Sequence, residues 1–168
     1  MKKKLLLGLI LIQLSICASA RGLKKVSGSL EILKEKADVT MTLSLEDATW
    51  EEDETFEEYC EDEYQERVQL LNKSWKSCFK KHSTGLTPSD DAPKYSAKLT
   101  ITNFEQKQGS NWGRMRIALY GTMTISELSA GNDVLVMKLD GICGSSDYNQ
   151  NDRLVKAVDE LCEKLFDL

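Results

Sequence analysis

The spacing of apolar residues changes along this chain, and that change limits the folds open to it. Apolar and polar residues alternate in 39–45, 95–102 and 115–125, which is the period of half-buried strands. From about Glu51 to Lys81, and again over 151–166, apolar residues recur at the three- and four-residue steps of one helix face. These patterns predict both strands and helices in one chain.

Two further strands complete the expected order. Leu30–Ile32 reads as a short strand before the first alternating one, and 134–139 is apolar on both faces, which favours a place inside a sheet. The order is then β-β-α-β-β-β-α, with short hairpins between the last three strands. We expect an α+β domain of two layers, in which a mainly antiparallel sheet carries one long and one C-terminal helix on one face.

Two details of these elements can be checked. A helix over 51–81 would be about 46 Å long, against a diameter of roughly 40 Å for a domain of this size. We therefore expect its acidic front end to overhang or fray. Gly121 interrupts the strand over 115–125 and predicts a bulge or a close backbone approach.

The first twenty residues have the pattern of a cleaved secretory signal. Lys2–Lys4 are followed by the apolar run Leu5–Leu14 and by the small residues of Ala18–Ala20. The run is about half of what a membrane-spanning helix needs. We expect residues 1–20 to be removed, and 21–168 to form a single domain without a transmembrane segment, periplasmic or secreted.

A lipid anchor at Cys17 is the alternative fate of the leader. Lipoprotein signals place a small residue before the cysteine, whereas Ile16 is bulky. We therefore expect Cys17 to be removed with the leader.

The net charge of the chain restricts the classes of molecule that it can bind. The chain has 22 basic and 27 acidic residues, a net charge of −5, and loss of the three leader lysines makes it about −8. An acidic surface argues against nucleic acid or an anionic membrane as the main partner. Twelve of the acids fall within 46–66, which contains no lysine or arginine. Most simply they form a solvated helix face.

A more specific interpretation is that these acidic residues form a surface that binds cations or a cationic partner. Glu54, Glu58 and Asp62, with Glu61, would share one face of the predicted helix. Calcium sites draw ligands from a folded loop of the D-x-D-x-D-G type, and that motif does not occur in the sequence. We therefore expect no metal and no cofactor.

Four cysteines follow the leader: Cys60, Cys78, Cys143 and Cys162. In an exported protein they permit two disulfides. On one continuous helix Cys60 and Cys78 would be about 27 Å apart, against roughly 4–7 Å between bridged Cα atoms. Any disulfide should therefore tie that helix to Cys143 or Cys162, and buried free thiols are the alternative.

Three features of the sequence are candidate sites. His82, the one histidine, follows Cys78 by four residues, so the pair could be catalytic or His82 could cap the helix end. The 143–148 loop, with Ser145 and Asp147, could be reactive or could begin the last helix. Trp112, in a glycine-flanked turn, could be an exposed recognition residue or pack over the end of the sheet.

Three segments resemble a known group of proteins. They are Ser27–Lys34 leading into an alternating strand, Tyr95–Leu99 and Asn151–Ala157. Together with the leader they resemble small uncharacterised exported proteins of Gram-negative anaerobic bacteria, periplasmic or of the envelope. The resemblance implies an α+β envelope domain and assigns no functional residue.

The sequence contains many fold signals and no recognisable catalytic motif such as G-x-S-x-G. We expect an exported, non-enzymatic binding or structural module of the cell envelope. Its partner would be an envelope protein or a second copy, met through a sheet edge, the acidic helix or Trp112. The alternative is a small secreted hydrolase or ligand-binding enzyme that uses His82 or the 143–148 loop.

Overall fold

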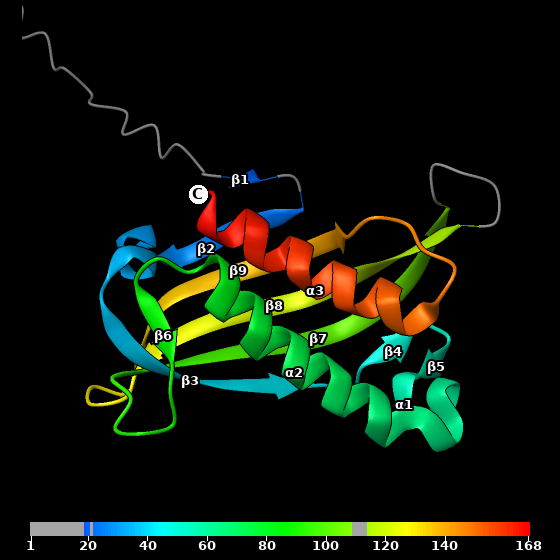
Figure 1. Cartoon of the computed structure of the whole chain (residues 1–168), viewed down its shortest axis with the longest axis horizontal. Coiled ribbons are helices and arrows are strands. Elements are labelled where there is room, and N and C mark those ends of the chain that lie inside the picture. Colours follow the sequence, from blue (N-terminus) through cyan, green and yellow to red (C-terminus); the bar gives the residue numbers. More distant parts are fainter. Residues whose placement is uncertain (1–18, 21, 109–113) are drawn as a thin grey trace, which may run out of the picture.

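The computed structural model describes residues 19–20, 22–108 and 114–168. Most of the predicted leader, with Cys17, and the turn that carries Trp112 lie outside these residues. Figure 1 shows an open sheet with two long helices lying across one face of it. Within the described part of the chain, no helix is long and apolar enough to cross a membrane.

The sheet has the order β1-β2-β9-β8-β7-β3-β6, and β4 and β5 lie beside one end of β7. The strands are β1 Ser19–Ala20, β2 Leu23–Gly28, β3 Ala37–Ser44, β4 Thr49–Trp50, β5 Glu54–Thr55, β6 Leu86–Pro88, β7 Tyr95–Gln108, β8 Met115–Glu127 and β9 Asn132–Cys143. The helices are the 3-10 helices η1 Leu30–Lys34 and η2 Glu61–Glu63, and the α-helices α1 Phe56–Cys60, α2 Tyr64–His82 and α3 Gln150–Phe166.

The antiparallel prediction holds in the centre of the sheet and is wrong at one edge. Strands β2, β9, β8 and β7 pair antiparallel. Strand β3 pairs parallel with β7, and β6 pairs parallel with β3. The reason is the connection: the chain leaves β3, passes through α1 and α2, and returns beside β3 as β7. Such a crossover makes the two strands parallel.

The first strand was predicted in the wrong place. Leu30–Ile32 lie in η1, where the Ser29 side chain accepts a hydrogen bond from the backbone N–H of Glu31. The strand is β2, just before it. Only Leu23 of β2 is buried, and the other residues of the strand are exposed. The sequence of β2 therefore lacks the alternation of apolar and polar residues by which a strand is recognised. The predicted order β-β-α-β-β-β-α therefore gains β1, β4, β5 and β6 and has β2 in place of 30–32.

The single helix predicted over 51–81 is broken instead of overhanging. Glu51 and Glu52 have left-handed backbone angles, φ 55° and 66°, and Glu61 has φ 50°. Thr55 begins α1 with a capping box, in which its side chain and that of Glu58 bond each other's backbone N–H. The acidic end is thus folded back onto the sheet as short elements.

One continuous core lies between the sheet and the two long helices. Trp75 and Phe79 of α2 and Leu161 and Leu165 of α3 are fully buried in it. Burial of each such side chain contributes roughly 1.5–3 kcal/mol.

The prediction for Gly121 is confirmed. Its φ is 152°, and a Cβ there would lie 2.0 Å from the carbonyl oxygen of Thr100. The pairing of β7 with β8 shifts register beside it, between Ile101 and Asn103. The close approach of the two backbones is therefore what requires glycine at this position.

Candidate functional site

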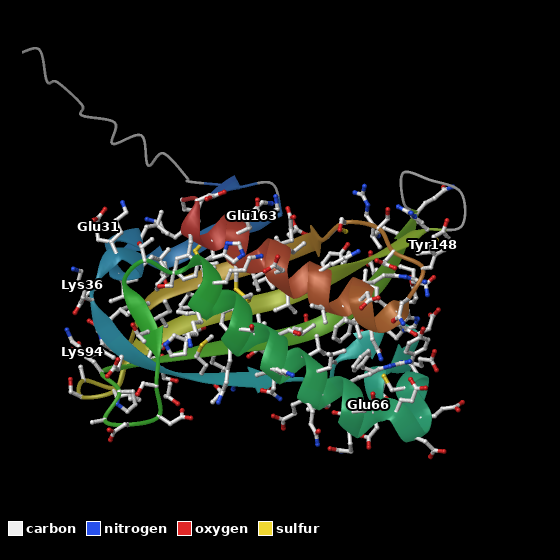
Figure 2. All side chains as sticks on the ribbon, viewed as in Figure 1. Glu31, Lys36, Glu66, Lys94, Tyr148 and Glu163 are labelled. Atoms are coloured by element: carbon white, nitrogen blue, oxygen red, sulfur yellow. A yellow bond between two sulfur atoms is a disulfide. The ribbon has the colours of Figure 1, made fainter. Side chains whose placement is uncertain are left out.

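A disulfide joins the two long helices. Cys78 of α2 and Cys162 of α3 are 5.9 Å apart at Cα and 84 residues apart in sequence. Both are buried, and side-chain sticks of both helices converge on the region between them in Figure 2. The bond is one of the pairings that the sequence left open, and it fixes the separation of α2 and α3.

The other two cysteines are free thiols. Cys60 is buried on α1, where Nη1 of Arg67 donates to its sulfur at 3.3 Å. Cys143 is half-buried at the end of β9. Burial raises the pKa of both thiols, which disfavours the reactive thiolate. Cys60 and Cys78 do not share one continuous helix, so that premise of the prediction was wrong.

A groove of about 430 Å³ runs between α2 and α3 beside this disulfide. Leu70, Val155 and Cys78 supply the apolar part of its lining. The polar part consists of three lysines, two serines and one carboxylate: Lys73, Lys81, Lys156, Ser74, Ser77 and Asp159. The lining carries more positive than negative charge, although the chain as a whole is acidic.

His82 has a structural role at this end of α2. Its Nε2 lies 3.1 Å from Oδ1 of Asp159 on α3, and Lys81 donates to the same carboxylate at 2.8 Å. Burial alone would raise the pKa of Asp159, but the hydrogen bonds from Lys81 and His82 bring it below its ordinary value. Because the sulfur of Cys78 is in a disulfide, Cys78 and His82 cannot form a nucleophile–base pair.

The 143–148 loop organises the start of α3. The Asn149 side chain accepts hydrogen bonds from the backbone N–H groups of Asn151 and Asp152 and so caps the helix. Asp147 accepts from the N–H groups of Tyr148 and Asn149 and pairs with Lys156. Lys156 first, then these N–H groups, lower the pKa of Asp147 to about 2. Ser145 is exposed.

The acidic segment, defined as residues 46–66, lies at one end of the molecule. All twelve of its carboxylates are exposed. Among the described residues only Glu63 has a salt-bridge partner, Arg67 at 2.6 Å. Figure 2 shows Glu66 at this end, where acidic oxygens project from α1 and the start of α2. The segment therefore presents uncompensated negative charge.

The predicted helical acidic face does not exist. Glu54 lies in β5, Glu58 in α1 and Asp62 in η2. Glu58 is turned back onto Thr55, whose hydroxyl and backbone N–H lower the pKa of the carboxyl. Within the residues that the structure describes, no group of three or more acids, histidines or cysteines is arranged to hold a metal ion.

Aromatic stacking makes the acidic segment rigid. The rings of Trp50 and Tyr59 are stacked with centroids 3.8 Å apart, and Phe56 stacks on Phe104 of β7 at 4.1 Å. The exposed carboxylates therefore stand on an ordered base, which limits the entropy lost when they bind a partner.

Sequence reasoning missed Arg67, which holds this end together. Its guanidinium bonds Glu63 and, at 3.2 Å, Oε1 of Gln150 on α3. Gln150 in turn donates to the hydroxyl of Tyr59 at 2.6 Å. Its position in the sequence could have indicated a buried side chain, because Arg67 falls on the apolar stripe of α2, four residues before Leu71.

No protein-family model and no curated protein matches the chain. It is similar to two structures of the PelC dodecamer from Paraburkholderia phytofirmans. One, a point variant, has 13% identity and a TM-score of 0.45, covering 85% of this chain and 95% of that chain. The other has 11% identity and a TM-score of 0.48, covering 84% and 96%.

A third similar structure is a neuraminyllactose-binding hemagglutinin homolog from Helicobacter pylori. Its identity is 10% and its TM-score 0.35, over 79% of this chain and 83% of that one. At these identities and TM-scores the likeness does not extend to function.

Proposed function

We propose that this chain is an exported, non-enzymatic binding or structural module of the cell envelope. It works through two charged surfaces, the acidic segment and the α2–α3 groove. The observation that carries the proposal is the charge left without a partner: twelve exposed carboxylates share one salt bridge among the described residues. Charge of one sign gathered on an ordered surface attracts a partner of opposite sign.

Export is supported by two independent features. The leader pattern of residues 1–20 is that of a secretory signal. The Cys78–Cys162 disulfide suits an oxidising compartment, since such bonds are rare in the cytosol. The resemblance to small exported proteins of Gram-negative anaerobes is consistent with the same location. The alternative is a lipid anchor at Cys17, and the intact mass of the mature protein distinguishes a lipidated Cys17 from a chain that begins at Arg21.

The enzymatic alternative has less support. Cys78 is closed in a disulfide, His82 is engaged with Asp159, and Asp147 and Asn149 begin α3. These groups stabilise the fold, whereas Lys73 of the groove and the carboxylates of the acidic segment other than Glu63 have no salt-bridge partner among the described residues.

The test is the size of the labelled mature protein in envelope extract, measured by sedimentation velocity. We expect a complex larger than the monomer for the wild type, and monomer for Glu57→Lys/Asp62→Lys and for Lys73→Glu. The controls, Glu163→Lys and Lys36→Glu, are single reversals of exposed charges that lie away from the acidic segment (Figure 2) and outside the groove lining. A wild-type protein that stays monomeric in extract would overturn the proposal.

A further inference from the structure

The two charged surfaces of this chain are opposite in sign. Residues 67–89 contain no acidic residue and five basic ones, with Arg67 included. Four of them are exposed on the second half of α2: Lys73, Lys76, Lys80 and Lys81. Lys73 and Lys81 line the α2–α3 groove. The acidic segment immediately before Arg67 has twelve acids and no base.

These surfaces cannot neutralise each other within one copy. The acidic segment ends near the first turn of α2, which begins at Tyr64. Lys73 and Lys81 lie about 14 Å and about 26 Å farther along the helix axis. Screening at physiological salt acts over about 8 Å. Within one copy Lys76 pairs with Asp90, Lys81 with Asp159 and Lys156 with Asp147, so among the described residues Lys73 and Lys80 are the lysines of this surface without a salt-bridge partner. These lysines and the unpaired carboxylates of the acidic segment are left to attract an opposite charge from another molecule.

We propose that the partner is a second copy of this chain, which docks its acidic segment against the α2–α3 groove of its neighbour. This rests on the proposed function, in which both surfaces bind, and it names their partner. Exposed carboxylates such as Glu57 and Asp62 meet Lys73 and its neighbouring lysines. The apolar lining from Leu70 and Val155 is covered in the contact.

The contact is heterologous, because it joins two different surfaces. An open chain of copies then keeps one unused acidic segment at one end and one unused groove at the other, until it closes on itself. Repetition gives a ring if the rotation closes and a filament if it does not.

A second copy fits better than a membrane or a nucleic acid. Both of those polyanions suit the groove but are repelled by the acidic segment. A second copy satisfies both surfaces at once, and its acidic segment is already ordered by the Trp50–Tyr59 stack.

The experiment uses the purified, oxidised mature protein alone. Sedimentation velocity is measured at about 10 mM and at about 1 M salt, where the Debye length is about 30 Å and about 3 Å. We expect species larger than the monomer at low salt and monomer at high salt. The groove variant Lys73→Glu/Ser77→Glu and the segment variant Glu57→Lys/Asp62→Lys each shift to monomer at low salt.

The decisive measurement is made on a mixture of the groove variant and the segment variant. The groove variant keeps a native acidic segment and the segment variant keeps a native groove, so the mixture regains the contact and associates. The variants change exposed residues, and the native circular dichroism spectrum of each checks its fold. Lys36→Glu and Glu163→Lys, each a single reversal of an exposed charge outside both surfaces, are the controls and associate like the wild type.

Three results would overturn the inference: wild-type monomer at low salt, association that survives in both variants, or a mixture that stays monomeric. If the pure protein is monomeric but forms a groove-dependent complex in envelope extract, this inference fails and the proposed function stands. Binding of monomer to vesicles of anionic lipid, lost in Lys73→Glu, would assign the groove to a membrane instead.

Discussion

Cys78 and Cys162 are 84 residues apart in sequence and 5.9 Å apart at Cα, where a disulfide ties α2 to α3. The bond closes a loop that contains β6 to β9 as well as parts of both helices. It thus links the middle of the chain to its end, across the groove on which the proposed function rests.

Removal of this bond should destabilise the protein strongly. In the chain-entropy account, a loop of this length contributes about 4.5 kcal/mol by restricting the unfolded chain. We expect Cys78→Ser/Cys162→Ser to lower the free energy of unfolding by about 2–5 kcal/mol in urea titrations. The matched control is Cys60→Ser/Cys143→Ser, which keeps the disulfide and should lose stability when reductant is added, whereas Cys78→Ser/Cys162→Ser should not respond to reductant. Equal reductant sensitivity in the two double variants would contradict the pairing.

Asn149 should contribute to stability as the N-cap of α3. Its side chain bonds the N–H groups of Asn151 and Asp152 at 2.8 Å and 3.3 Å. Asn149→Ala should lower the free energy of unfolding by about 1 kcal/mol. Ser145→Ala, in the same loop and exposed, should be near neutral. A larger effect at Ser145 would show that the loop has another role.

Asp147 should make stability depend on acid. Its pKa falls to about 2 in the folded protein and is about 3.9 when unfolded. The resulting stabilisation is complete above about pH 4 and is lost as pH falls through about 2. The wild type should therefore be more stable than Asp147→Asn at neutral pH, with a gap that closes between about pH 4 and about pH 2. Urea titrations across this range measure it, and a gap independent of pH would contradict the assignment.

Gly121 should tolerate no side chain. A Cβ there meets the Thr100 carbonyl, whereas one at Gly131, φ 64°, meets nothing within 4 Å. Gly131→Ala thus isolates the backbone penalty, about 1 kcal/mol. Gly121→Ala should lower the free energy of unfolding by at least about 2 kcal/mol. Equal losses in thermal or urea unfolding would mean that β7 and β8 separate easily at the bulge.

The second half of the fold follows from local sequence. Leu154 to Leu165 form one stripe, so α3 was predicted close to its observed position. Tyr95 to Ile101 alternate cleanly, so the start of β7 was predicted, but the strand runs six residues beyond the predicted 95–102, to Gln108. The parallel pairing of β3 could not be read locally, because it depends on which strand the chain meets after α2. Strand β2 was not predicted because its exposed residues, lysines among them, do not alternate with apolar ones.

The broken helix shows where tertiary packing overrides a periodic pattern. Phe56 and Cys60 fit the helical spacing, and both are indeed buried on α1. The stacking of Trp50 on Tyr59 and of Phe56 on Phe104 fixes where this helix starts and requires a turn after it. These contacts cannot be inferred from the spacing of apolar residues along the sequence.

The candidate site was only partly visible in the sequence. The lysines of α2 were explicable as helix electrostatics alone, until the fold placed Lys156 and Val155 of α3 opposite Lys73 and Leu70. The groove between two helices far apart in sequence is a tertiary feature.

We propose that this chain acts outside the cytoplasm as an oxidised binding module. The decisive measurement is the intact mass of the protein isolated from fractionated cells, with and without alkylation of unfolded material. We expect an extracytoplasmic chain that begins at Arg21 and has one disulfide and two alkylatable thiols, Cys60 and Cys143. A cytoplasmic chain that begins at Met1, with all five cysteines alkylated without reductant, would contradict it.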